Sequence, residues 1–165
     1  MNHLKNIKSK IVTPAQLEEK IREWRKEKCK IVFTNGCFDI IHLGHIDYLA
    51  RAADFGNKFV IGLNTDSSVS RIKGPTRPIN DEHSRSMVMA ALEFVSAITF
   101  FDDPTPYELI KLVQPDILVK GADYKAEDIV GYDIVMARGG SVETIPLVSG
   151  YSTTNIETRI RSAKN

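Results

Sequence analysis

The sequence lacks most features that would set it apart from ordinary globular proteins. Its 165 residues include two cysteines, Cys29 and Cys37, in neither the CxxC pairs of a zinc site nor a disulfide framework. No apolar run approaches the roughly 20 residues of a membrane helix, and the first residues lack the apolar segment of a secretory signal. We therefore expect a protein of a reducing, cytoplasmic compartment.

An excess of charge of one sign is also absent. The 22 basic and 21 acidic side chains leave a formal net charge of +1. Because nucleic acids and anionic membranes are held mainly through clustered basic charge, this balance predicts neither a nucleic-acid partner nor a membrane partner. We expect one globular domain over residues 1–165, in which residues 1–29 form a helix that leads into the core.

Apolar, β-rich segments alternate with helical patterns along the chain. Predicted strands cover residues 30–34, 59–63, 95–101, 116–119 and 141–145. Predicted helices cover residues 13–28, 81–93 and 126–138, with others opening near residue 44, after a capping box at 105–108, and near residue 154. Such alternation predicts a doubly wound, Rossmann-like α/β fold with a five-stranded parallel sheet. Residues 64–80 are expected to form a functional loop.

The segment after the first strand is the most informative part of the sequence. Ligands of open parallel sheets bind beyond the carboxyl ends of the strands. Here a glycine-bearing turn enters a helix that carries His42 and His45, and a helix N-terminus favours a phosphate. Gly44 would let the phosphate approach closely. The segment matches neither the P-loop nor the GxGxxG pattern, so we predict a different phosphate site.

These residues resemble a known superfamily. His42-Leu43-Gly44-His45 resembles the HxGH signature of the cytidylyltransferase-like nucleotidyltransferases, and residues 150–156 resemble their second phosphate-binding motif. Segments at 35–39, 64–66, 73–74, 77–78, 105–106, 115–116 and 120–124 are similar to the heptose 1-phosphate adenylyltransferase family. That family occurs as part of a bifunctional kinase/adenylyltransferase or as a separate chain, and we expect the separate form. One departure is Gly121-Ala122, where the family usually has two glycines.

The resemblance implies a reaction of ATP with D-glycero-β-D-manno-heptose 1-phosphate that gives ADP-heptose and pyrophosphate, for lipopolysaccharide or other surface-glycan precursors. A sugar-phosphate oxygen, ionised at neutral pH, would attack the α-phosphorus, so no protein nucleophile is needed and Cys37 is not expected to be catalytic. Mg²⁺ held mainly by the ATP phosphates is the implied cofactor, with no protein metal site. A homodimer is expected, as is common in the superfamily.

The candidate residues fall into three groups. The predicted catalytic residues, which would stabilise charge on the reacting phosphates, are His42, His45 and Lys73. The nucleotide would be bound by Asn35, Gly36, Cys37, Phe38, Gly44, Gly121, Asp123, Ser152, Thr153 and Thr154. The heptose phosphate would be bound by Asp39, Asn64, Asp66, Arg77 and Arg85, with an alternative in which Asp39 orients His42.

Two other functions remain open on the sequence. The HxGH chemistry is indifferent to the acceptor, so a nucleotidyltransferase for glycerol 3-phosphate, phosphocholine or phosphopantetheine is an alternative. A non-catalytic nucleotide sensor would have the same fold, but we would expect it to have lost His42, His45, Lys73 or the hydroxyl run at 152–154, all of which are present.

Overall fold

A computed structural model of the protein describes residues 2–122 and 125–163. Within these residues the strands form one sheet in the order β3-β2-β1-β4-β5, and every neighbouring pair is parallel. The strands are β1 (Ile31–Gly36), β2 (Lys58–Asn64), β3 (Ala97–Phe101), β4 (Ile117–Gly121) and β5 (Ser141–Ile145). The prediction of a doubly wound, five-stranded parallel sheet is confirmed. The direction of winding reverses between β1 and β4, which is where such sheets bind ligands.

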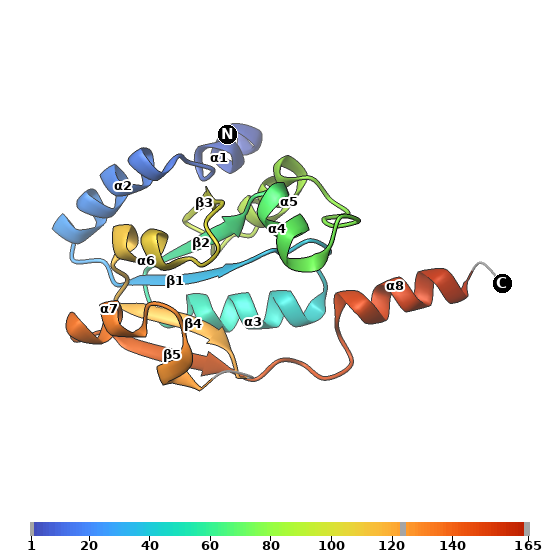
Figure 1. Ribbon diagram of the computed structural model, residues 1–165. Helices are drawn as coiled ribbons and strands as arrows, with labels where there is room; N and C mark the ends of the chain where they lie inside the picture. Colours follow the sequence, from blue (N-terminus) through green and yellow to red (C-terminus); the bar gives the residue numbers. More distant parts are fainter. Residues whose placement is uncertain (1, 123–124, 164–165) are drawn as a thin grey trace.

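Helices cover both faces of the sheet (Figure 1). One face carries α2 (Pro14–Lys26), α6 (Tyr107–Val113) and α7 (Tyr132–Ala137), and the other carries α3 (Leu43–Ala53) and α5 (Glu82–Ala90). The remaining helical segments are α1 (His3–Ser9), α4 (Asp66–Lys73), the 3₁₀ turn η1 (Ala126–Asp128) and α8 (Thr153–Ser162). Within the described part of the chain, no helix is long and apolar enough to cross a membrane.

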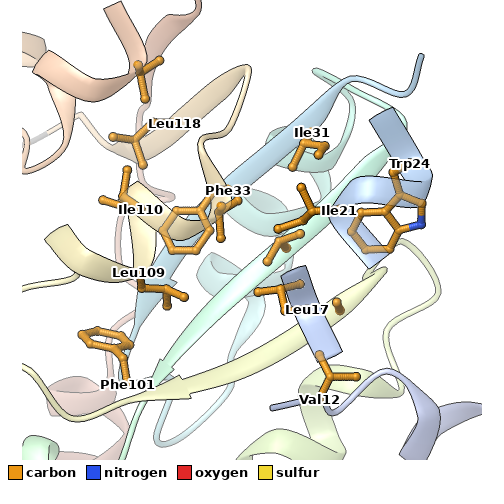
Figure 2. Packing of buried hydrophobic residues seen from close by; sticks show 14 of the residues in the cluster. Val12, Leu17, Ile21, Trp24, Ile31, Phe33, Phe101, Leu109, Ile110 and Leu118 are labelled. Carbon is orange, nitrogen blue, oxygen red and sulfur yellow. The ribbon is translucent and has the colours of Figure 1, made fainter. Parts of the chain in front are cut away.

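Each face of the sheet has its own hydrophobic core because successive strand residues point to opposite sides. Figure 2 shows the first core, in which Leu17, Ile21 and Trp24 of α2 lie over the sheet beside Leu109 and Ile110 of α6. The second core lies beneath α3 and α5 and is built from residues such as Leu49, Met89, Val32, Ile61 and Val119. The two cores hold α2, α3 and α6 firmly against the sheet.

The N-terminal segment covers the exposed edge of β3. Ile11 forms a parallel bridge with Ile98, and the Val12 amide donates to the Ile98 carbonyl at 2.9 Å. An unpaired edge strand is prone to aggregation, so this cover protects the sheet. The capping box of α2 is present, because the Thr13 hydroxyl accepts from the Gln16 amide and the Gln16 side chain accepts from the Thr13 amide.

Four sequence predictions differ from the observed elements. Residues 1–29 do not form one helix, because Ile11 bridges to β3 between α1 and α2. Residues 64–80 are not a continuous loop, because α4 occupies residues 66–73 and the Thr65 side chain caps it by accepting from the Ser68 amide. The predicted capping box at 105–108 is wrong, since α6 starts after Pro106 and, among the described residues, has no side-chain cap. The predicted helix at 126–138 is divided into η1 and α7 by Gly131, whose φ is +91°.

Candidate functional site

The two histidines lie together at the start of α3. His42 is the N-cap residue, in an extended conformation, and His45 follows on the first turn. Their rings stack with centroids 3.8 Å apart and planes 25° from parallel. Both Nδ1 atoms are buried and have no hydrogen-bond partner among the described residues. Both half-buried rings also line the hollow beside the start of α8, where their accessible atoms can meet a ligand that supplies acceptors.

Burial sets the charge of both histidines. It lowers the pKa of His45 to about 4, with further lowering from the nearby His42 and Lys73 and an opposing effect from the Ile40 carbonyl. Burial also lowers the pKa of His42. Both shifts favour the neutral ring at pH 7, which has one N–H donor and one acceptor nitrogen. A bound polyphosphate would raise both pKa values, because negative charge favours the imidazolium form.

Close packing around the loop requires two of its small residues. A Cβ on Gly44 would lie 3.2 Å from the His42 ring and 3.4 Å from Cβ of Tyr151, so the glycine lets the ring lie over the start of α3. Phe38 adopts a φ of +44°, which is uncommon outside glycine. Its buried ring meets His45 edge-on, with centroids 5.6 Å apart, and lies 3.0 Å from where a Cβ on Gly36 would be. Phe38 thus packs the histidine pair.

A cleft of about 370 Å³ opens between the ends of β1 and β4. It brings together the predicted nucleotide-binding residues of the β1 loop, the end of β4 and the start of α8, namely Asn35, Gly36, Cys37, Phe38, Gly121 and Thr153. It also contains His45 and Lys73. An adjoining hollow of about 300 Å³ is lined by His42, Gly44, His45, Lys73, Leu147, Tyr151, Ser152, Thr153 and Thr154. The predicted catalytic residues therefore share one continuous site with most of the predicted nucleotide-binding residues.

The start of α8 forms the second wall of the site. The Ser152 side chain caps the helix by accepting from the Asn155 amide at 3.1 Å, and Asn155 Nδ2 donates to the Gly150 carbonyl at 3.1 Å. Ser152, Thr153 and Thr154 line the same hollow as the histidines, and the N-terminus of a helix favours an anion. Yet no residue of α8, Thr153–Ser162, is buried, and the helix extends away from the sheet (Figure 1).

Lys73 lies where the hollows meet. It is the last residue of α4, and the following Gly74 ends the helix with a φ of +98°. Its side chain lines the cleft, the hollow beside the histidines, and a third hollow of about 270 Å³ next to Thr76 and Arg77. An exposed ammonium group at this junction can neutralise phosphates bound on either side. Its catalytic role remains a prediction.

Two predicted heptose ligands are buried inside the protein instead. The Asp39 side chain is 1% exposed, and its carboxylate accepts from the amides of Ile79 and Asn80 and pairs with Arg77. The Arg85 side chain is 0% exposed. These contacts within the protein occupy both side chains, and heptose binding by Asp39 and Arg85 stays a prediction.

Arg85 joins three loops at the carboxyl edge of the sheet. Its guanidinium donates to the Cys37 carbonyl at 2.7 Å, the Asn80 carbonyl at 3.1 Å and Oδ1 of Asp66 at 2.6 Å. A residue predicted to bind substrate therefore holds together the loop after β1, the start of α4 and the segment before α5. The sequence shows no sign of this role, because residue type alone does not reveal burial.

The other predicted heptose ligands lie near the cleft. Asn64 is buried, and its side-chain amide donates to the Ser68 hydroxyl at 2.9 Å. The Asp66 side chain is partly exposed and pairs with Arg85. Arg77 lines the third hollow but pairs with carboxylates on both sides. Heptose binding by Asn64, Asp66 and Arg77 remains a prediction. Asp123 lies outside the described residues.

The sequence analysis missed several side chains that line the site. Lys120 donates to Asn35 on the cleft wall, and the Tyr48 hydroxyl donates to the Val119 carbonyl at 3.0 Å. Leu147 and Tyr151 present apolar surface, at 59% and 50% exposure. Lys120 sits at the end of a predicted strand and Tyr151 beside the predicted hydroxyl run. Those two positions were the signals in the sequence that could have identified Lys120 and Tyr151 as site residues.

The departure at Ala122 causes no strain. Its amide donates to the Ile145 carbonyl at 3.0 Å, which extends the pairing of β4 with β5. Ala122 is not among the described residues with positive φ. Alanine is therefore tolerated where the resembling family has its second glycine, because the backbone here does not need a glycine-only conformation.

The chemistry available in the site is that of positioned donors. Burial raises the pKa of Cys37 above its ordinary value, with smaller opposing effects from nearby cations, so its thiol is not an activated nucleophile. Among the described residues no group of three or more His, Cys, Asp or Glu side chains could hold a metal ion. What the site does offer a polyphosphate is two imidazoles, a lysine and a helix N-terminus.

Another hollow lies at the amino-terminal ends of the strands, and the helix ends nearby explain its basic side chains. It measures about 420 Å³ and is lined in part by Lys28, Lys30, Asp116 and Arg138. Several helices end near this edge, and Arg25 donates to the carbonyls of Val113 and Gln114 at the end of α6. Basic side chains are favoured beside helix C-termini. We assign no ligand to it.

Comparison with known proteins agrees with this geometry. The model of the family described as cytidylyltransferase-like matches residues 33–159, from β1 into α8. The chain belongs to the cytidylyltransferase-like family. This cytidylyltransferase-like chain is 48% identical over 155 residues to the bifunctional protein HldE of Magnetococcus marinus and 49% identical over 160 residues to that of Campylobacter concisus. These alignments cover 94% and 97% of the chain, but 32% and 33% of the relatives. The chain thus spans about a third of their length.

Two solved structures resemble the cytidylyltransferase-like chain. A lipopolysaccharide core biosynthesis protein from Thermoplasma volcanium has a TM-score of 0.58 and 29% identity, covering 75% of this chain and 99% of that one. Pantoate-beta-alanine ligase from Francisella tularensis has a TM-score of 0.60 and covers 94% of this chain and 78% of that one. Its 14% identity makes this second likeness one of fold alone.

Proposed function

We propose that the protein is a heptose 1-phosphate adenylyltransferase, acting on ATP and D-glycero-β-D-manno-heptose 1-phosphate. The observation that carries the proposal is the stacked pair of His42 and His45, which line one hollow together with the start of α8 and Lys73. The family match supports nucleotidyl transfer. The sequence motifs, the HldE relatives and the lipopolysaccharide core biosynthesis protein support the heptose acceptor.

The chain's part in this reaction is electrostatic and positional. A phosphate oxygen of the acceptor attacks the α-phosphorus of ATP, a new P–O bond forms, and the bond to the bridging oxygen breaks to release pyrophosphate. The acceptor is already ionised, so no side chain needs to remove a proton. The neutral His42 and His45 donate N–H groups to phosphate oxygens, and Lys73 balances charge between the two reactants. Cleft residues from β1 and β4 hold the nucleotide in line with the acceptor.

Mg²⁺ would enter with ATP as part of the substrate. The Asp39 carboxylate beside the cleft is already occupied by amides and Arg77. Mg²⁺ commonly keeps its waters and binds through substrate phosphates, where it neutralises charge. We extend the proposal to residues 1–165 acting as one nucleotidyltransferase domain, in the cytoplasm and as a homodimer. The two free cysteines support a reducing compartment.

The test is pyrophosphate release with ATP, CTP or GTP and Mg²⁺, crossed with both anomers of heptose 1-phosphate, glycerol 3-phosphate, phosphocholine and phosphopantetheine. Release with ATP and the β-anomer, with ADP-heptose identified by mass spectrometry, is the expected result. Pyrophosphate release with a different pair of substrates would change the proposed acceptor or nucleotide base, and the proposed phosphate chemistry would stand. ATP binding without any release would support the sensor hypothesis instead.

A further inference from the structure

The attachment of α8 to the body of the protein differs from that of the other long helices. Its start forms a wall of the phosphate site, yet none of its residues, Thr153–Ser162, is buried. A helix without a buried face draws little stability from hydrophobic packing. Something else must set the place of Thr153 and Thr154 beside the histidines.

An ion-pair network supplies this attachment. Glu157 Oε1 on α8 pairs with Arg77 Nη1, and Arg77 Nη2 pairs with Asp39 Oδ2 at 2.8 Å. The Asp39 carboxylate in turn accepts from the amides of Ile79 and Asn80. The network therefore runs from α8, through the segment after α4, to the loop that leads to the histidines.

Burial distinguishes this network from an ordinary surface pair. The Arg77 and Asp39 side chains are 12% and 1% exposed, and Glu157 is 31% exposed. The pair of Arg71 with Asp102, by contrast, has both side chains more than half exposed and should contribute little. In a partly buried network, loss of one carboxylate leaves the charge of Arg77 incompletely compensated.

The geometry points to Glu157 as a positioning residue for the phosphate site, a role that rests on the proposed function. Glu157 lies four residues after Thr153, on the same side of α8, so holding Glu157 also holds the first turn of the helix. Through Arg77 it seats the N-terminal amides of α8 next to the stacked histidines. Glu157 itself does not touch the reacting atoms.

Hydrogen exchange of the ligand-free protein tests the attachment without any substrate. In Glu157→Gln, amides of residues 153–162 should exchange about tenfold faster, because a charge-assisted hydrogen bond that holds the helix is lost. Glu18→Gln removes the same charge from an exposed position on α2 and serves as the matched control. Unchanged exchange in Glu157→Gln, or equal acceleration in both variants, would overturn the proposal.

Binding and kinetics test the positioning role. Glu157→Gln should raise the KM for ATP about tenfold while kcat stays within about threefold, because the helix contributes to binding before and during the reaction. The Kd of a non-hydrolysable ATP analogue, measured by calorimetry, should rise equally. An unchanged Kd and KM for ATP would contradict the role. An equal fall of kcat in both variants would also contradict it, because it would mean general damage.

The two proposals can fail separately. If the wild-type chain releases no pyrophosphate with any acceptor, but Glu157→Gln still loosens α8 and weakens binding of the ATP analogue, the positioning role stands and the proposed function falls. If ADP-heptose is made but neither exchange nor ATP binding responds to Glu157→Gln, the positioning role falls and the proposed function stands.

Discussion

The two helices that start at the phosphate site are held in opposite ways. Helix α3 is built into the protein, with Gly44, Tyr48, Leu49 and Ala52 buried and the Tyr48 hydroxyl bonded to the Val119 carbonyl on β4. Helix α8 buries none of its residues and depends on polar contacts at its first turns.

This difference separates two tasks. Donors whose geometry must not change during the reaction benefit from a rigid support, and the histidine pair has one in α3 and the sheet. Backbone amides that must admit and release a charged ligand can be carried by an element with low local stability. We therefore regard α3 as the fixed half of the site and α8 as its adjustable half.

Removing Arg85 should have the largest effect, because it supports the fixed half. Arg85→Ala would leave Asp66 and the carbonyls of Cys37 and Asn80 without their buried partner, at a cost of about 3–5 kcal/mol in the free energy of unfolding. Urea denaturation measures this. Arg71→Ala, which breaks an exposed pair with Asp102, is the control and should cost less than about 1 kcal/mol. An equal loss of unfolding free energy in Arg85→Ala and Arg71→Ala would contradict the supporting role assigned to Arg85.

Removing a histidine donor should damage catalysis and leave the fold intact. We expect His42→Ala to lower turnover at least about 10²-fold, because a preorganised donor to the reacting phosphates is lost. His83→Ala, at an exposed position on α5, should behave like the wild type. Steady-state kinetics and a melting curve separate the two effects. Turnover of His42→Ala within about threefold of the wild type would remove His42 from the mechanism.

A matched pair of helix caps compares the adjustable half with an embedded helix. Thr13→Ala removes the cap of α2, which packs in the core, and should lower the free energy of unfolding by about 1 kcal/mol. Ser152→Ala removes the same kind of cap from α8 and should leave global unfolding unchanged. It should instead weaken binding of an ATP analogue about fivefold, the equivalent of the same cap energy. A clear loss of global stability in Ser152→Ala would show that α8 is not separately adjustable.

The pH dependence of stability should report the burial of His45. Its pKa is about 4 in the folded protein against 6.5 for an unperturbed histidine, so the unfolded chain binds a proton first as the pH falls. Stability should therefore decline between pH 6.5 and pH 4, by about 1 kcal/mol once solvent screening is allowed for. Urea titrations of His45→Gln should show a smaller decline. An identical decline in the variant would assign the effect to other groups.

The sequence predicted the sheet because its strands are short apolar runs bounded by turn residues. β5 was predicted at residues 141–145, where the structure has it, and the loop with His42 and His45 was found because it follows a strand. Helix α4 was missed, since its polar sequence, DSSVSRIK, has little apolar periodicity and is fixed by Thr65 and by packing on β2.

The roles of charged residues were harder to predict than their location. Asp39 was placed at the correct end of the sheet, but the partners of Asp39 and Arg85 come from positions 5 to 48 residues away in the sequence. Residue type and spacing show that a carboxylate or guanidinium is near a site. They do not show whether that group faces the ligand or holds the loop.

The most direct test of the account is a titration of the histidine ring resonances by ¹⁵N NMR, with and without a non-hydrolysable ATP analogue and Mg²⁺. The account predicts that the analogue perturbs both His42 and His45 and raises the pKa of His45 from about 4, because the negative charge of phosphates bound in this hollow favours the imidazolium form. Binding of the analogue with both histidine resonances and the pKa of His45 unchanged would contradict it.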